Sequence, residues 1–311
     1  DLEMPEMDGL QTLSELARLG FTCNVLVFSS LSKRGAEITM EALRLGASDF
    51  ISKPNGSDTS GGSPAEMVKA LLEPKIVALF PDLGETNPTP ESKSSPQVVS
   101  ESSSYPKATI AFMGPKVILI GSSTGGPSAL EKIFSRISPP VSCPIVITQH
   151  MPPIFTATFA ERLSRISGVP AAEGKDGEPL QNNRIYVAPG NYHMRLTGTT
   201  DDARIALDQG PLIHSVRPAV DPLFSSAAAI FGNRCLAFVL TGMGADGCDG
   251  TVSIKEAGGG VVIQNQESCV VFGMPGAVFA RGAYDKIADL DGIADILIGF
   301  SGRSITAGGA G

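Results

Sequence analysis

The sequence predicts an α/β protein, in which a doubly wound parallel-sheet domain follows a smaller, partial α/β domain. Short apolar runs alternate with helix-forming stretches along most of the chain. Because these runs lack the alternation of a half-exposed sheet, we expect parallel strands that are buried on both faces. The length of 311 residues and the apolar content of 42% suit two domains, each with its own core.

The first domain is expected at residues 1–80. Asp8 and Gln11 have the spacing of a capping box and Gly20 is a typical helix end, so a helix is expected between them. Apolar runs predict the other elements: strands at 24–28 and 49–51, and helices at 35–45 and 65–72, the last broken near Pro74.

A linker is predicted at 81–114, because 12 of the 26 residues from Pro81 to Pro106 are proline or serine and bury too little apolar surface to become ordered. The second domain should span 115–300, and the tail 301–311, rich in small residues, is expected to be disordered. In the second domain, strands are expected at 116–120, 144–148, 184–187, 235–240 and 260–264, and helices at 126–137, 154–166, 221–230 and 246–257. Such sheets bind ligands at the carboxyl ends of their strands.

The composition restricts the function classes. With 24 basic against 32 acidic residues, the net charge of −8 argues against nucleic acid as a partner. No apolar run reaches the roughly 18 residues of a membrane span, and the first residues lack a signal-peptide pattern, so we expect a cytoplasmic protein without membrane insertion. The five cysteines lack C-x-x-C spacing and are expected to be buried, reduced thiols, with no metal site.

A candidate nucleophile lies directly after the first strand of the second domain. The run from Gly121 to Gly126 contains G-x-S-x-G with Ser123 at its centre, between a predicted strand and a predicted helix. Its glycines permit a tight turn that exposes the hydroxyl, and the N–H groups of the first helical turn face any oxyanion nearby. The alternative is a turn that binds phosphate or no ligand.

A serine nucleophile needs a base, and the chain has three histidines. His150 follows a predicted strand and should lie at the same sheet edge as Ser123. His193 lies in a predicted loop, and His214 lies in another loop with no strand to orient it. We therefore expect His150 to be the base, although a single histidine is often only structural.

Asp246 follows the predicted strand 235–240 and could orient His150. It could also be a plain helix N-cap. A rival interpretation concerns the same loop, because Gly242–Gly247 reads G-x-G-x-x-G and Glu267 lies where a ribose-binding acid of a dinucleotide-binding enzyme would be. Against it, Asp246 would place a carboxylate beside the pyrophosphate, and the motif lies late in the domain.

Six sequence blocks together resemble the chemotaxis methylesterases of the CheB type, over Lys116 to about Leu290. The order of these blocks along the chain matches as well, which makes the resemblance far more specific than any single motif. The blocks are Gly121–Gly126, Gln149–Pro152, Ala188–Gly190, Arg217–Asp221, Leu240–Gly247 and Ser268–Pro275.

The first domain resembles a response-regulator receiver of the flavodoxin-like fold. Asp1 matches the phosphoacceptor, Ser29 the switch hydroxyl, and Lys53 the lysine that contacts phosphate. A receiver's first strands and its Mg²⁺-binding acidic pair would precede residue 1, so the resemblance implies a truncated receiver that cannot bind Mg²⁺ normally. Mg²⁺ is expected only for an intact receiver, and the esterase domain is expected to be at least partly unregulated.

The resemblance implies a serine hydrolase that demethylates glutamate γ-methyl esters on methyl-accepting chemoreceptors and, in many relatives, deamidates glutamines. By analogy, Ser123 is the nucleophile, His150 the base and Asp246 its orienting acid. The N–H of Met243, with Thr124, would bind the oxyanion. No cofactor is expected for catalysis, and a chemotaxis histidine kinase is the implied phosphodonor. A non-catalytic signalling adaptor is the remaining alternative.

Overall fold

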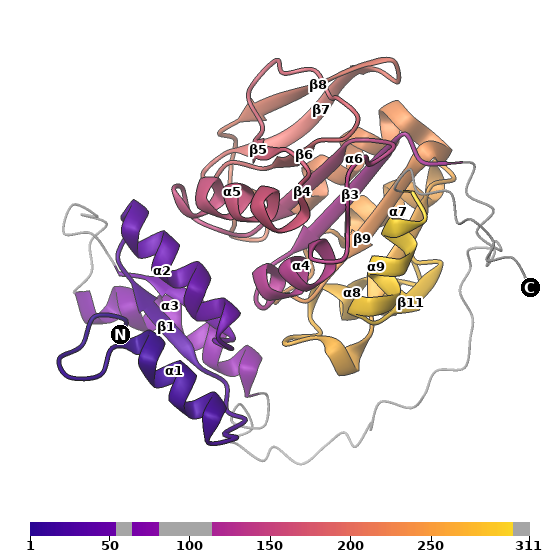
Figure 1. Ribbon diagram of the computed structural model, residues 1–311. Helices are drawn as coiled ribbons and strands as arrows, with labels where there is room; N and C mark the ends of the chain where they lie inside the picture. Colours follow the sequence, from indigo (N-terminus) through magenta and orange to yellow (C-terminus); the bar gives the residue numbers. More distant parts are fainter. Residues whose placement is uncertain (54–63, 81–113, 301–311) are drawn as a thin grey trace, which may run out of the picture.

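The computed structural model describes residues 1–53, 64–80 and 114–300. Apart from Gly114, the predicted linker lies outside these residues, as does the predicted tail. Figure 1 shows two α/β bodies: a small one at the amino-terminal end and a larger one built around a central sheet. In the described part of the chain, every helix is too short or too polar to cross a membrane.

The described residues of the small body, which we call the receiver segment after the family it resembles, form two parallel strands and three helices. Its elements are α1 (Gly9–Arg18), β1 (Leu26–Ser29), α2 (Lys33–Arg44), β2 (Asp49–Ser52) and α3 (Pro64–Leu79). The predicted capping box is confirmed: the Asp8 side chain accepts from Gln11 N, and the Gln11 side chain accepts from Asp8 N.

The prediction of a helix broken near Pro74 is wrong, because α3 continues through that residue. A proline removes only one N–H donor from a helix, and Pro74 is exposed, so water can hydrate the carbonyl it leaves free.

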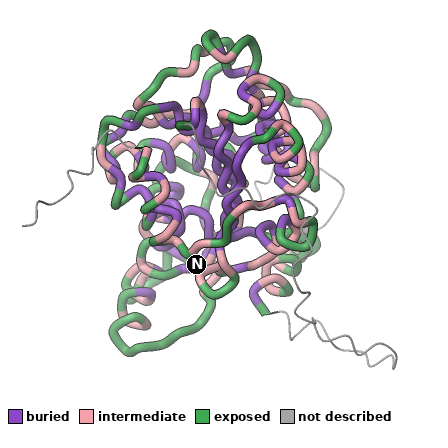
Figure 2. Tube along the Cα trace, turned by 90° about the vertical axis from the view of Figure 1, so that its right-hand side faces the viewer, coloured by how far each residue is buried: buried purple, intermediate pink, exposed green. Residues whose placement is uncertain are grey.

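The large body, which we call the catalytic domain after the family it resembles, contains a parallel seven-stranded sheet in the order β11-β10-β9-β3-β4-β6-β5. The strands are β3 (Val117–Ser122), β4 (Ile145–Gln149), β5 (Ala171–Glu173), β6 (Ile185–Val187), β9 (Cys235–Val239), β10 (Gly260–Gln264) and β11 (Lys286–Ala288). Its central strands are buried on both faces, as predicted, and they form the buried interior in Figure 2.

Helices cover both faces of this sheet. One face packs against α4 (Gly126–Phe134), α5 (Phe155–Ser167) and α9 (Leu290–Ile298), and the other against α6 (Val220–Phe231), α7 (Cys248–Glu256) and α8 (Met274–Arg281). The side chains of β3 alternate between these two cores, with Ile118 and Ile120 in the first and Val117 and Leu119 in the second. The sheet is therefore doubly wound.

The antiparallel hairpin of β7 (His193–Thr199) and β8 (Asp202–Asp208) is an element that the sequence did not predict. His193 is the first residue of β7, so the expectation that it lies in a loop is wrong. The cysteine prediction is also wrong in part: none of the five forms a disulfide, but only Cys143 and Cys235 are buried, whereas Cys23 is exposed and Cys248 and Cys269 are partly exposed.

The two bodies contact each other beside the carboxyl end of β3. The Phe50 ring stacks on the Phe155 ring with 4.6 Å between centroids. The buried carboxylate of Asp49 accepts a 2.6 Å hydrogen bond from the Thr124 hydroxyl and also pairs with Lys75. The receiver segment therefore lies against the residue that follows Ser123.

Candidate active site

The pairing of β3 with β4 places Ser123 next to His150. Ser122 and Gln149 are partners at the ends of these strands, and His150 N donates to Ser122 O at 3.1 Å. The Gln149 side chain accepts from the Ser122 hydroxyl and donates to Ser123 O. Two adjacent strand ends thus fix the candidate nucleophile and base.

His150 and Asp246 form a direct hydrogen bond, with 2.7 Å between His150 Nε2 and Asp246 Oδ2. Only 1% of Asp246 is exposed, and its carboxylate also accepts from the N–H groups of Val220, Asp221 and Gly247 at 2.6, 3.0 and 2.9 Å. Burial acts to raise the pKa of Asp246, but the hydrogen bond and charge of His150 and these N–H groups outweigh it, so the pKa lies below its usual range.

This hydrogen bond assigns separate tasks to the two ring nitrogens. Because Nε2 donates to Asp246, Nδ1 of His150 is the nitrogen left to accept a proton. Within the described residues, no protein group forms a hydrogen bond with the Ser123 hydroxyl, so that hydroxyl is free to turn toward the imidazole or a substrate.

The glycine-rich loop after β9 packs directly on Ser123. Ser123 N donates to Thr241 O, and a Cβ at Gly242 would lie 2.8 Å from Ser123 Cβ, so only glycine fits there. In the described part of the chain, neither the Thr124 nor the Met243 N–H donates to a protein acceptor. Both predicted oxyanion donors therefore remain available to a ligand.

The structure also tests the structural alternatives for these residues. Asp246 is not the N-cap of α7, because that helix begins at Cys248 after Gly247. His193 is buried: its Nδ1 accepts from Ala219 N and its Nε2 donates to Pro211 O, so it supports the loop before α6.

His214 lies in a loop, as predicted, but it is not isolated. Its Nε2 lies 2.9 Å from Asp221 Oδ2. The sequence analysis assigned no role to Asp221. Its position as the last residue of the Arg217–Asp221 block, one of the six blocks that resemble the family, was the signal that could have identified it.

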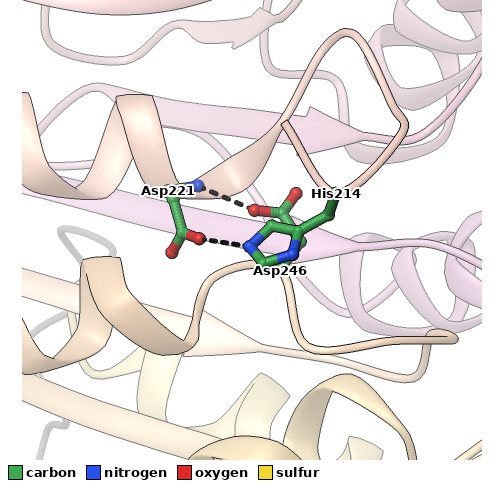
Figure 3. A group of neighbouring side chains, drawn as sticks. All are labelled: His214, Asp221 and Asp246. Carbon is green, nitrogen blue, oxygen red and sulfur yellow. Dashed lines mark hydrogen bonds and ion pairs between the residues drawn. The ribbon is translucent and has the colours of Figure 1, made fainter. Parts of the chain in front are cut away.

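Among the described residues, one group of three His, Cys, Asp or Glu side chains has ligand atoms close enough together to hold a metal ion. It consists of His214, Asp221 and Asp246, whose ligand atoms lie within 4.8 Å of one another (Figure 3). However, each Asp246 oxygen already accepts two hydrogen bonds. A metal ion would have to displace the bond to His150 or the backbone donors, so this group does not form a metal site.

The candidate residues of the receiver segment also lie close together. Lys53 Nζ pairs with Asp1 Oδ2 at 2.7 Å. Ser29 is buried, and its hydroxyl donates to Gly35 O and accepts from the Thr39 hydroxyl. Among the described residues, Asp1 belongs to no group of three His, Cys, Asp or Glu side chains whose ligand atoms lie close enough together to hold a metal ion.

The chain is similar to known proteins in both of its domains. The family described as CheB methylesterase matches residues 118–297, and the response regulator receiver domain matches residues 1–59. A protein-glutamate methylesterase/protein-glutamine glutaminase of Bradyrhizobium diazoefficiens is 41% identical over 94% of this chain and 79% of its own length. One from Rhodospirillum rubrum is 42% identical over 94% and 80%.

A solved structure is similar as well. The crystal structure of the CheB methylesterase catalytic domain of Thermotoga maritima is 40% identical, with a TM-score of 0.58. The match covers 60% of this chain and 98% of that one.

Proposed function

The chain belongs to the CheB methylesterase family, and from this premise we propose that it hydrolyses glutamate γ-methyl esters on chemoreceptors, with Ser123, His150 and Asp246 as its catalytic triad. The observation that carries the triad is the partly buried His150–Asp246 hydrogen bond, which lies at the strand end beside Ser123. The rival dinucleotide interpretation of Gly242–Gly247 has no support in the family assignment.

In the first half-reaction, the Ser123 hydroxyl gives its proton to His150 Nδ1 while Oγ attacks the ester carbonyl carbon. Asp246 stabilises the imidazolium that forms, through the hydrogen bond at Nε2. The free N–H groups of Thr124 and Met243 bind the oxyanion. The imidazolium then protonates the leaving methoxy oxygen, so methanol departs and an acyl-enzyme remains.

In the second half-reaction, water repeats the attack. His150 takes a proton from water, hydroxide adds to the acyl carbon, and the proton returns to Ser123 Oγ as the free glutamate leaves. A glutamine side chain enters the same sequence with ammonia in place of methanol, which is the second activity in the relatives' names. Every proton in this scheme moves between groups of the chain, the substrate and water, so we propose that hydrolysis uses no cofactor.

We further propose that, in the intact receiver, a chemotaxis histidine kinase is the phosphodonor and Asp1 the acceptor. The match to the receiver family supports this, as does the placement of Lys53 against Asp1. The contact of Asp49 with Thr124 gives the receiver segment direct access to the residue after the nucleophile.

The test is labelling with a serine-directed phosphonate, combined with methanol release from methylated receptor. The phosphonate should label the peptide that contains Ser123, and Ser123→Ala should abolish labelling and lower methanol release at least about 10³-fold. The matched control is Ser135→Ala, which removes an exposed hydroxyl bonded only to its own helix. Normal turnover in Ser123→Ala would disprove the triad. Receptor binding without methanol release in the native chain would favour the adaptor.

A further inference from the structure

Helices α6 and α7 begin side by side, and neither has a side-chain cap of its own. The N-cap residues are Ala219 and Gly247, and neither side chain accepts a hydrogen bond from its helix. The first N–H groups of a helix need acceptors, and a buried helix end without them is costly. Each of these two helices receives its acceptors from the other.

Asp246, which lies just before α7, caps α6. Its carboxylate accepts from the N–H groups of Val220 and Asp221, the first two residues of that helix. Asp221, in turn, caps α7: its Oδ1 accepts at 2.7 Å from Gly250 N, in the first turn of α7. The two helix starts are thus joined by a reciprocal pair of caps.

The close approach of the two helices leaves this arrangement little freedom. A Cβ at Gly250 would lie 2.6 Å from Phe224 Cβ and 3.2 Å from Asp221 Oδ1, so glycine is needed where α7 meets α6. Asp221 is itself nearly buried, and burial, followed by the negative charge of Asp246, raises its pKa against the hydrogen bonds from Gly250 and His214. Figure 3 shows His214 next to the outer carboxylate oxygen of Asp221, Oδ2, and the N–H of Asp221 directed at the carboxylate of Asp246.

We propose that Asp221 is a positioning residue for Asp246, a role that rests on the proposed function of the triad. The Asp246 carboxylate must keep its oxygen at hydrogen-bond distance from His150, and it lies on the loop that leads into α7. By fixing the first turn of α7 against α6, Asp221 holds that loop in place. His214, which is 39% exposed, contacts only the outer oxygen of Asp221. The capping oxygen, Oδ1, therefore carries the role.

The experiment compares kcat and KM for Asp221→Ala, Asp221→Asn and Asp246→Asn in the full chain. Asp221→Ala removes the cap of α7 and should lower kcat by about 10²-fold with KM unchanged, as expected for a displacement of the acid by about 1 Å. Asp221→Asn keeps an oxygen for Gly250 N and should stay within about threefold of the native kcat. Ser225→Ala is the matched control, because it removes an α6–α7 contact at 3.5 Å that does not involve Asp246.

Rates are divided by the amount of enzyme that the phosphonate labels at completion, so a partly unfolded variant is still scored. Native kcat in Asp221→Ala, or equal losses in the Ala and Asn variants, would overturn the proposal. If Asp221→Ala yields no folded protein, the test rests on Asp221→Asn, and a tenfold loss of kcat in that variant would overturn the proposal. A failure of the triad itself would be seen separately, as native kcat in Asp246→Asn.

Discussion

Asp246 in the catalytic domain and Asp1 in the receiver segment are held in opposite ways. Asp246 is 1% exposed, and its two oxygens accept four hydrogen bonds. The Asp1 side chain is 42% exposed, and its described partners are Lys53 and Leu2 N. The first carboxylate is saturated and enclosed, and the second is open to solvent on one side.

The difference follows from what each group is proposed to do. An acid that orients a catalytic histidine must be in place before the substrate arrives, so burial and fixed donors favour it. A carboxylate that accepts a phosphoryl group needs an oxygen that a partner can reach. The catalytic domain therefore leaves Asp246 little freedom, whereas each oxygen of Asp1 has one partner among the described residues.

The largest effect should come from Asp246→Asn. The amide keeps the size of the carboxylate but cannot stabilise an imidazolium, so kcat should fall by about 10⁴-fold. Methanol release with methylated receptor measures the rate, and circular dichroism checks the fold. A loss of less than tenfold would mean that the enclosed carboxylate is structural only.

The contact between the two regions should give the next largest effect. Phe50 is buried and stacks on Phe155, so Phe50→Ala should destabilise the protein by about 3–5 kcal/mol. Phe21→Ala, in the same segment but 62% exposed, is the control and should change stability by less than about 0.5 kcal/mol. Urea unfolding measures both variants, and equal midpoints would show that the stacking contributes nothing.

Acid should act on the enclosed carboxylate. Because the folded-state pKa of Asp246 lies below its usual range, ionised Asp246 stabilises the fold above about pH 4, the ordinary value for aspartate. This stabilisation is lost as the pH falls through the folded-state pKa. The native protein should therefore lose more stability than Asp246→Asn between pH 5 and pH 2 in urea titrations. Parallel curves for the two proteins would contradict the assignment.

The ionisation of Asp221 should have the opposite effect on stability to that of Asp246. The pKa of Asp221 is raised, so its ionisation destabilises the fold as the pH rises through the raised value. Relative to the native chain, Asp221→Asn should gain stability between pH 4 and pH 8, measured by the same titrations. A relative loss over that range would show that the pair with His214 outweighs burial.

The smallest effect on stability should come from the exposed ion pair of Lys53 and Asp1. Lys53 and Asp1 are both about half exposed, so Lys53→Met should change the free energy of unfolding by less than about 1 kcal/mol. Lys255→Met provides the contrast, because Lys255 pairs with Asp285 inside the catalytic domain and its loss leaves a buried charge, at about 3–5 kcal/mol. Similar losses for the two variants would remove the distinction between the regions.

The sequence alone predicted the structural features that depend on a local pattern of residues. Continuous apolar runs predicted β3, β4, β9 and β10, and the residues that follow their ends include Ser123 and His150. The capping box at Asp8 was also predictable, because both partners lie within one helical turn.

The tertiary partners were not predictable in this way. Asp246 and Asp221 cap helices that begin about 25 residues away, so no local spacing reveals either contact. The strand that begins at His193 was not predicted because the Pro, Gly and Asn residues just before it are typical of a loop. The strand is instead half of the antiparallel hairpin of β7 and β8. Pro74 was misjudged because only its exposure makes an interior proline tolerable.

The most direct test of the triad is a double-variant cycle of Ser123→Ala and His150→Gln, with methanol release as the readout. Residues that act as one unit lose the same function whichever is removed, so the double variant should be no more than about threefold slower than the slower single variant. If the two losses instead multiply, Ser123 and His150 act independently, and the proposed proton transfer between them is wrong.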